Sequence, residues 1–269
     1  MKDINVIHKI IFINHIKDIN STKQYTGRPA ITQYLEIYKS IIFKVSTGVS
    51  WIDTKIYGKY STSTVFNYFS TWNKIGLFEK IYKSLLNVYS KTRRFNWKNI
   101  SIDSTTIKCY RGGDNIGSNS TDRGRNGSKI HTLTDGNGIP LSSFITKANF
   151  HDSKAISELM NNFKKNYKKP SYNIYANLDS AYDSNEVKTI LKGHKFIPII
   201  PKNKRNSSSA NEIMSDHHKK IYKNRIQIEY YYAQLKMYKS FLIRFVRKID
   251  HFYSFLHIAN SGIISSRCI

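Results

Sequence analysis

Residues 100–110 read ISIDSTTIKCY, and apolar and polar side chains alternate along most of this segment. Alternation with a period of two is typical of a β-strand that has one buried face. Residues 129–141 have a similar pattern around Asp135-Gly136-Asn137-Gly138, a sequence that favours a tight turn. We therefore predict a strand followed by a β-hairpin in the centre of the chain.

Helical and strand patterns alternate after this hairpin. Residues 155–163 have helical spacing, and the segment YNIYANLDS at 172–180 alternates as a strand. A further helix is predicted over 184–191 and a short apolar strand over 196–200. Such alternation indicates an α/β domain built in layers.

The first third of the chain has only helical patterns. One helix is predicted over residues 30–45, a second opens near Ser61 and breaks at Gly76, and a third runs through Leu85. We therefore divide the chain into a small all-helical domain over residues 1–95 and an α/β domain over residues 96–269.

Composition narrows the class of protein. The 269 residues include 43 Lys and Arg against 18 Asp and Glu, and the resulting net charge of +25 points to a polyanionic partner such as nucleic acid. Two cysteines are too few for a disulfide framework or a cysteine-built zinc site. No apolar run approaches the roughly 20 residues of a membrane-spanning helix, so we expect a cytoplasmic protein without a membrane partner.

The most informative spacing lies between residues 222 and 236. Tyr222, Arg225, Glu229 and Lys236 fall within an arc of roughly 60° if this segment is one helix that begins near Asp216. They would form a polar stripe beside an apolar one. The alternative is that Arg225 and Glu229 are only an exposed ion pair one turn apart.

Two further acids end predicted strands. Asp103 lies in the first strand and Asp179 follows NIYANL, and a carboxylate at the end of a core strand points into a crevice where ligands gather. Taken singly, each could instead form a turn or cap a helix. Together with Glu229 they supply hard oxygen ligands for two Mg²⁺ ions about 4 Å apart, as two-metal phosphoryl transfer requires.

These segments resemble the DDE-type transposases of bacterial insertion sequences, in the four/five superfamily with a Tyr-Arg-Glu-Lys signature. The spacing of Tyr222, Arg225, Glu229 and Lys236 matches that signature completely, and IDSTTIK and LDSAYDS match the segments around the two catalytic aspartates. Similar segments also include GRPAITQYLEIYKSIIFKVSTGVSW, RGRNGSKIHTLTDGNGIPL and FHDSKA. Ser180 is a departure, because the family commonly has Lys there.

The resemblance implies an RNase H-like catalytic domain, a mixed sheet flanked by helices, behind a helix-turn-helix-like DNA-binding domain. It implies that Asp103, Asp179 and Glu229 are the catalytic residues and metal ligands, with two Mg²⁺ ions for which Mn²⁺ may substitute. Tyr222, Arg225 and Lys236 would bind DNA. The expected partners are the terminal inverted repeats of a mobile element, the target DNA and a second copy of the chain, in a homodimer on DNA.

The resemblance therefore implies an enzyme that cuts DNA and transfers its 3′-hydroxyl ends. Two other functions stay open: a decayed or domesticated copy that only binds DNA, and an RNase H-like nuclease that acts on RNA hybrids. A minor candidate is the pair His151-Asp152, which could assist near the metals or could cap the helix that follows.

Overall fold

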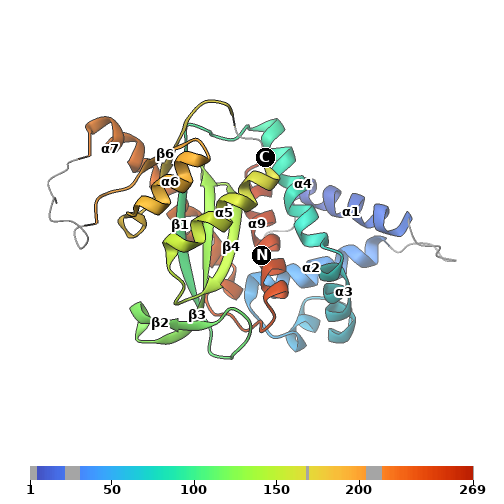
Figure 1. Cartoon of the computed structure of the whole chain (residues 1–269). Coiled ribbons are helices and arrows are strands. Elements are labelled where there is room, and N and C mark those ends of the chain that lie inside the picture. Colours follow the sequence, from blue (N-terminus) through green and yellow to red (C-terminus); the bar gives the residue numbers. More distant parts are fainter. Residues whose placement is uncertain (1–4, 22–30, 168–169, 204–213, 269) are drawn as a thin grey trace. The chain divides into compact units, whose positions relative to one another are not determined.

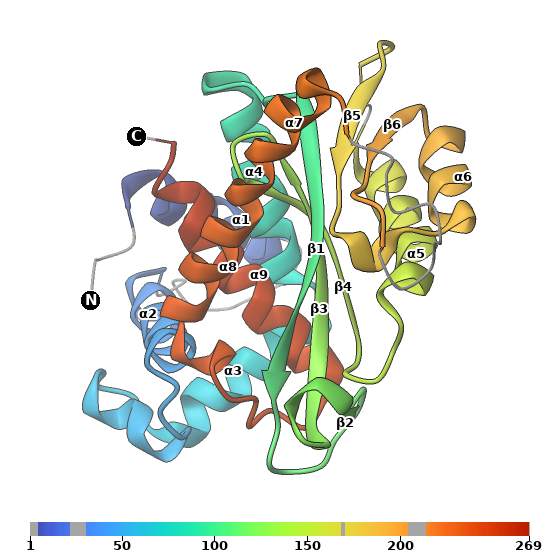
Figure 2. The same ribbon diagram turned by 90° about the vertical axis from the view of Figure 1, so that its left-hand side faces the viewer.

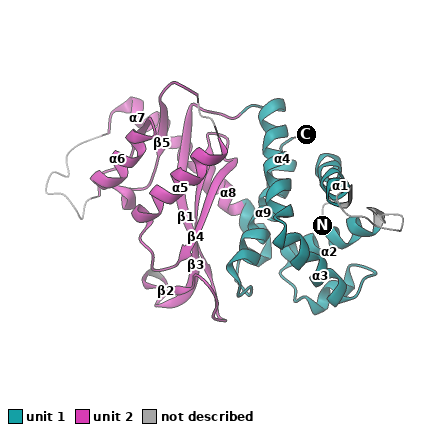
Figure 3. Ribbon diagram, turned by 45° about the vertical axis from the view of Figure 1, so that its right-hand side comes forward, with its two compact units in different colours: residues 1–94, 234–269 teal, residues 95–233 magenta. Residues whose placement is uncertain are grey.

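The computed structural model describes residues 5–21, 31–167, 170–203 and 214–268 (Figure 1). Its contacts divide the chain into two compact units (Figure 3). The helical unit comprises residues 1–94 and 234–269, and the sheet unit comprises residues 95–233. Residues 234–269 are predicted from the sequence to belong to the α/β domain, whereas their contacts group them with the N-terminal helices.

The helical unit is formed by helices of both its segments. They are α1 (Val6–Ser21), α2 (Ile31–Thr47), η1 (Ile52–Ile56), α3 (Thr62–Lys74), α4 (Leu77–Thr92), η5 (Lys239–Phe241) and α9 (Ile249–Ser265). Ser61 caps α3 by accepting a hydrogen bond from the Thr64 amide. Gly76 separates α3 from α4 with a φ of 68°, a left-handed conformation that glycine adopts without strain.

An aromatic cluster explains why the C-terminal segment belongs to this unit. Phe69 is fully buried, and its ring lies 5.0 Å from the Trp51 ring and 5.5 Å from the rings of both Phe78 and Phe255. Phe255 is on α9, which buries eleven of its seventeen residues. A helix buried on most sides stabilises a domain chiefly through packing, so α9 is part of the core.

We predict that Phe69→Ala lowers the free energy of unfolding by about 3–5 kcal/mol, because it leaves a cavity among the aromatic rings that surround it. Phe66→Ala is the matched control on the same helix, since Phe66 is 36% exposed and should cost much less. Chemical denaturation of both variants measures the difference. Equal losses would show that Phe69 is not central to the core.

The sheet unit contains one six-stranded sheet. Its strands are β1 (Asn99–Lys108), β2 (Gly117–Asn119), β3 (Arg125–Asp135), β4 (Pro140–Lys147), β5 (Ile174–Asn177) and β6 (Phe196–Ile199). The main strands lie in the order β4-β3-β1-β5-β6, and β3 alone runs against the others. This is the strand order of an RNase H-like sheet, which confirms the expected fold.

The pairing of β1 fixes which side chains share a face. Asp103 lies opposite Thr132 and Ser104 opposite His131 in the antiparallel ladder with β3. The parallel ladder with β5 covers only Asn99 to Ser101, so β1 extends beyond it. Successive side chains of a strand point to opposite faces, which places Asp103 and Ser104 on different sides of the sheet.

Helices cover both faces of the sheet (Figure 2). On one face, α5 (Asp152–Asn166) packs on β3 and β4, and α6 (Asn185–Gly193) packs on β6. From the other side, α7 (Asp216–Tyr222) contacts β5 and the turn η4 (Lys223–Arg225) contacts β1, and α8 (Ile226–Met237) follows. No helix in the described ranges is long and apolar enough to cross a membrane.

The predicted continuous helix from Asp216 is wrong in one respect, because the 3₁₀ turn η4 separates α7 from α8. Asn224 explains the break. Its side-chain amide donates to the Asn99 side chain at 2.7 Å and to the Gly136 carbonyl at 2.9 Å, which ties the turn to the sheet. The apolar stripe of α8 is nevertheless as expected, with Ile228 and Leu235 fully buried.

Candidate functional site

Asp103 lies in the middle of β1 with a carboxylate that is only 21% exposed. One oxygen accepts a hydrogen bond from the Ser104 amide at 2.8 Å, and the other accepts from Arg225 at 2.7 Å. Burial raises the pKa of Asp103, the Ser104 amide and the Arg225 guanidinium lower it, and the Asp179 charge raises it further. A net rise shows that burial and the second carboxylate outweigh the two donors.

Asp179 follows β5 and stands before the 3₁₀ turn η3 (Ser180–Tyr182). Its Oδ1 atom accepts hydrogen bonds from the amide and the hydroxyl of Ser180, at 2.5 and 3.0 Å. Ser180 therefore binds the aspartate directly. Since Asp179 raises the pKa of Asp103, the two carboxylates of neighbouring strands act on each other.

Arg225 joins the signature residues to Asp103. One guanidinium nitrogen lies 2.7 Å from Asp103 and another lies 2.9 Å from Glu229. Tyr222 lies in the same neighbourhood: burial raises its pKa, Arg225 lowers it, and Asp179 and Asp103 raise it. The sheet unit thus brings together Asp103, Asp179, Tyr222, Arg225 and Glu229, as the sequence analysis expected.

The ion pair between Arg225 and Glu229 is the one that the sequence analysis had weighed as an exposed surface pair. Glu229 is 50% exposed, so this pair contributes little to stability. Arg225 itself is 18% exposed and binds a partly buried carboxylate as well. Glu229 therefore behaves as one half of an exposed ion pair, whereas Arg225 is partly buried and has a second partner in Asp103.

The donor set has the right chemistry for a hard divalent cation. The carboxylate oxygens of Asp103, Asp179 and Glu229 are the kind of ligand that Mg²⁺ prefers, and the charge of Asp179 raises the pKa of Asp103. Among the residues that the structure describes, no group of three or more His, Cys, Asp or Glu side chains is arranged to hold a metal ion. Glu229 is instead paired with Arg225.

Lys236 lies near the end of α8, two turns after Glu229, and its side chain is exposed. The boundary between the two units falls within this helix, between Ala233 and Gln234. Lys236 therefore belongs to the helical unit and not to the sheet unit that holds the other signature residues.

A second polar cluster lies on the other face of β1 and was largely missed from the sequence. His151 is the N-cap residue of α5 but makes no side-chain cap, so the proposed capping role is wrong for it. Asp152 in the first turn accepts a hydrogen bond from the Ser104 hydroxyl at 2.8 Å. It also lies 3.1 Å from the Lys129 ammonium. The segment FHDSKA was the available signal, but the partner strands are distant in sequence.

His131 belongs to this cluster and is almost fully buried, at 1% exposure. Its Nε2 atom is 2.8 Å from the Thr146 hydroxyl, and its Nδ1 atom is 3.6 Å from Asp152. Burial lowers the pKa of His131 to about 4, although the Asp152 charge raises it. The imidazole is therefore neutral near pH 7.

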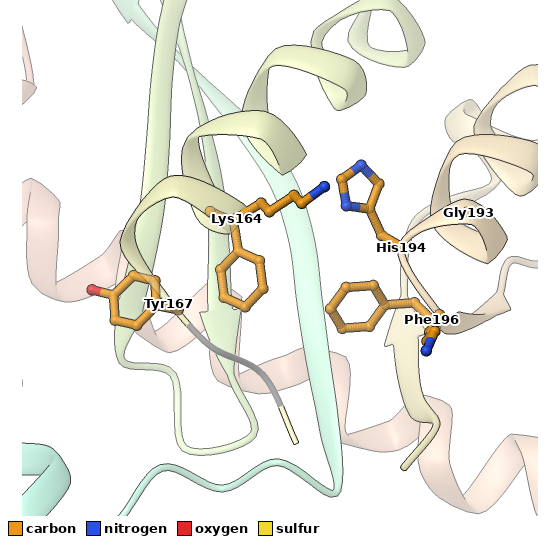
Figure 4. A pocket seen from close by; sticks show the side chains of 7 residues that line it. Lys164, Tyr167, Gly193, His194 and Phe196 are labelled. Atoms are coloured by element: carbon orange, nitrogen blue, oxygen red, sulfur yellow. The ribbon is translucent and has the colours of Figure 1, made fainter. Parts of the chain in front are cut away.

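A pocket of about 280 Å³ lies elsewhere in the sheet unit (Figure 4). Lys164 extends toward the His194 ring above an aromatic wall that includes Phe196 (Figure 4). The pocket adjoins the start of β6, whereas Asp179 follows the end of the parallel strand β5, so the two are at opposite edges of the sheet. Lysines at the ends of α5 and α6 complement the helix dipoles, which accounts for the positive charge here.

Comparisons with known proteins identify the family of the chain. The family model described as "Transposase DDE domain" matches residues 98–261. A relative from Burkholderia cepacia, named as the transposase for insertion sequence element IS402, is 30% identical over 149 residues. That match covers 53% of this chain and 64% of the relative, so the chain spans less than two thirds of the relative's length.

Two solved structures are weakly similar. The catalytic domain of Mos1 mariner transposase has a TM-score of 0.31 at 14% identity, over 70% of this chain and 88% of that one. The Mos1 mariner paired end complex with Mn has a TM-score of 0.29 at 11% identity, over 99% and 88%. The fold assignment therefore depends on the strand order of the sheet unit and not on these likenesses.

The buried neutral His131 makes stability depend on pH. Because its folded pKa of about 4 lies below the ordinary value of about 6.5, the unfolded chain binds more protons between these values. The stabilisation that comes from burying the neutral His131 ring is therefore complete above pH 6.5 and is lost as the pH falls toward 4. We predict that, as the pH falls through this range, the free energy of unfolding decreases by on the order of 1–3 kcal/mol more in the wild-type protein than in His131→Gln. Denaturation at several pH values measures the difference; parallel curves would contradict it.

Proposed function

Because the chain belongs to the DDE transposase family, we propose that it cuts DNA at the ends of a mobile element and joins the freed ends to target DNA. The observation that carries this proposal is the convergence of Asp103 and Asp179 from neighbouring strands, with Glu229 linked to Asp103 through Arg225. Carboxylates within electrostatic reach of each other are typical of functional sites.

The reaction would have two phosphoryl-transfer steps. In the first, a water oxygen attacks a phosphorus atom at the end of the element, and the 3′-oxygen leaves as a free hydroxyl. In the second, that 3′-hydroxyl attacks a phosphorus atom of the target, and a target 3′-oxygen leaves. The number of phosphodiester bonds is conserved in the second step, so no external energy source is required.

Asp103, Asp179 and Glu229 would hold two Mg²⁺ ions, for which Mn²⁺ may substitute. Such ions activate the attacking oxygen and stabilise the leaving oxygen. The residues of the chain then have distinct roles: the three carboxylates provide oxygen ligands, and Arg225 neutralises charge beside them. Tyr222, Arg225 and Lys236 would contact the DNA.

Double-stranded DNA is the proposed partner. The chain would bind two DNA substrates, the terminal inverted repeats of the element and the target DNA. The net charge of +25 supports this, since each lysine or arginine that binds a phosphate releases counterions. The N-terminal helices would recognise the inverted repeats, and two copies of the chain would act together on the two ends.

The first test of this function removes each carboxylate. We predict that Asp103→Asn, Asp179→Asn and Glu229→Ala each reduce Mg²⁺-dependent cleavage of element-end DNA to background. Asp216→Ala is the matched control, because Asp216 is a surface aspartate of the same unit with a 90% exposed side chain. Substantial cleavage by one variant would remove that residue from the catalytic set. Absence of cleavage by the wild-type protein would favour the non-catalytic DNA-binding alternative.

A second test concerns the phosphate contacts. We predict that Arg225→Gln and Lys236→Gln each lower the slope of log K against log salt by about 0.9 in magnitude on duplex DNA. Affinity for element ends and for random DNA should fall about equally, since phosphates carry no sequence information. Lys108→Gln is the control, because Lys108 lies in the sheet unit, outside the proposed DNA contacts, and pairs with Asp122 at 3.1 Å. An unchanged slope would show that Arg225 serves only to pair with carboxylates.

A further inference from the structure

Ser104 is hydrogen-bonded on both faces of the sheet. Its backbone amide donates to the Asp103 carboxylate at 2.8 Å, and its hydroxyl donates to the Asp152 carboxylate at 2.8 Å. One residue therefore links the proposed metal ligand on β1 to the first turn of α5. Each hydrogen bond restricts the conformation of the peptide that carries Asp103.

Asp152 is itself held in place by several groups. The Lys129 ammonium lies 3.1 Å from its Oδ1 atom and also donates to the Phe150 carbonyl at 3.0 Å. Lys129 is only 14% exposed, so this pair is less screened by water than a surface ion pair. The amino-terminal end of α5 favours a carboxylate in its first turn. The neutral His131 closes the cluster from β3.

Tyr182 is a buried side chain near the same cluster. It lies in η3, three residues after Asp179, and is 1% exposed. Burial raises its pKa well above the ordinary value, and the charges of Asp152, Asp103 and Asp179 raise it further, while the Ser104 hydroxyl lowers it. The phenol is therefore within electrostatic reach of all three aspartates.

We propose that Asp152 is a positioning residue that holds Asp103 in place through Ser104. This inference deepens the proposed function and rests on it, because it assigns a supporting role around the same carboxylates. Groups of this kind orient the direct ligands of a metal, and their loss typically lowers metal affinity about 10–100-fold.

Successive side chains of β1 point to opposite faces of the sheet, and this distinguishes a positioning role for Asp152 from that of a metal ligand. Asp103 faces Arg225 and the turn before α8, whereas Ser104 faces α5 and Asp152. Asp152 therefore acts from behind the strand that bears Asp103. It orients that strand and does not face the cation.

The experiment measures binding of Mn²⁺ alone to the full chain, by the electron paramagnetic resonance signal of the free ion. The variants are Ser104→Ala, Asp152→Asn and the double variant. Asp122→Asn is the control, since Asp122 pairs with Lys108 at 3.1 Å on the surface of the same unit. We expect each single variant to weaken binding roughly 10-fold at unchanged stoichiometry. The double variant should be no weaker than the weaker single variant, and the control should equal wild type.

Three results would overturn the inference. If folded Asp152→Asn binds Mn²⁺ with wild-type affinity, Asp152 has no positioning role. If the losses of affinity add up in the double variant, the two residues do not act through one link. If Asp152→Asn binds one Mn²⁺ ion fewer than the wild-type protein, Asp152 is itself a metal ligand. If Asp152→Asn does not fold, Ser104→Ala tests the same link, because it removes one hydroxyl and leaves the Lys129 pair. DNA cleavage is measured on the same samples. If the variants weaken Mn²⁺ binding as expected but the wild-type protein does not cleave DNA, the proposed function is refuted and this inference still holds.

Discussion

The burial of the Asp103 carboxylate is the constraint on which the rest of the site depends. A carboxylate that is only 21% exposed loses hydration, and in a site of this kind the loss costs several kcal/mol unless partners offset it. The Ser104 amide and the Arg225 guanidinium are those partners. The pKa of Asp103 is still raised, so these partners do not fully offset its burial.

The position of Arg225 depends in turn on the turn between α7 and α8. Asn224 holds η4 against the sheet through Asn99 and the Gly136 carbonyl, and Arg225 is the next residue. The i,i+4 spacing to Glu229 then brings that glutamate to the same guanidinium. The turn η4, which is anchored on the sheet, contains Arg225, and the helix α8 that carries Glu229 begins directly after it. The spacing between the two signature residues therefore determines that both side chains meet.

Local patterns predicted the parts of the fold that local physics determines. The strand at 100–110, the hairpin and the helices that follow were correct because hydrophobic periodicity and turn residues lie within a few positions of each other. The helices α1 and α9 were not predicted, and residues 234–269 were placed in the other domain. That placement depends on packing such as Phe255 on Phe69, across nearly two hundred residues, which no local pattern reveals.

The same distinction applies to the site. The signature residues were recognised from their spacing, and Asp179 follows a strand as expected. Asp103 does not end a strand but lies in the middle of β1, because the ladder with β3 extends β1 beyond its pairing with β5. The break at Asn224 was missed because its partners lie 125 and 88 residues away. The link from Asp152 to Ser104 spans 48 residues, so FHDSKA drew notice without revealing its partner.

The register of β1 against β3 finally decides which chemistry each face receives. A slip of one residue would turn Asp103 toward α5 and Ser104 toward Arg225, because side chains alternate between faces. The hairpin turn after β3 restricts such a slip. The fully buried Asp135 accepts hydrogen bonds from the amides of Asn96, Asn137 and Ile139, so its carboxylate joins the segment before β1 to that turn. Asp135, which is not one of the proposed ligands, thereby helps to fix the faces on which Asp103 and Ser104 act.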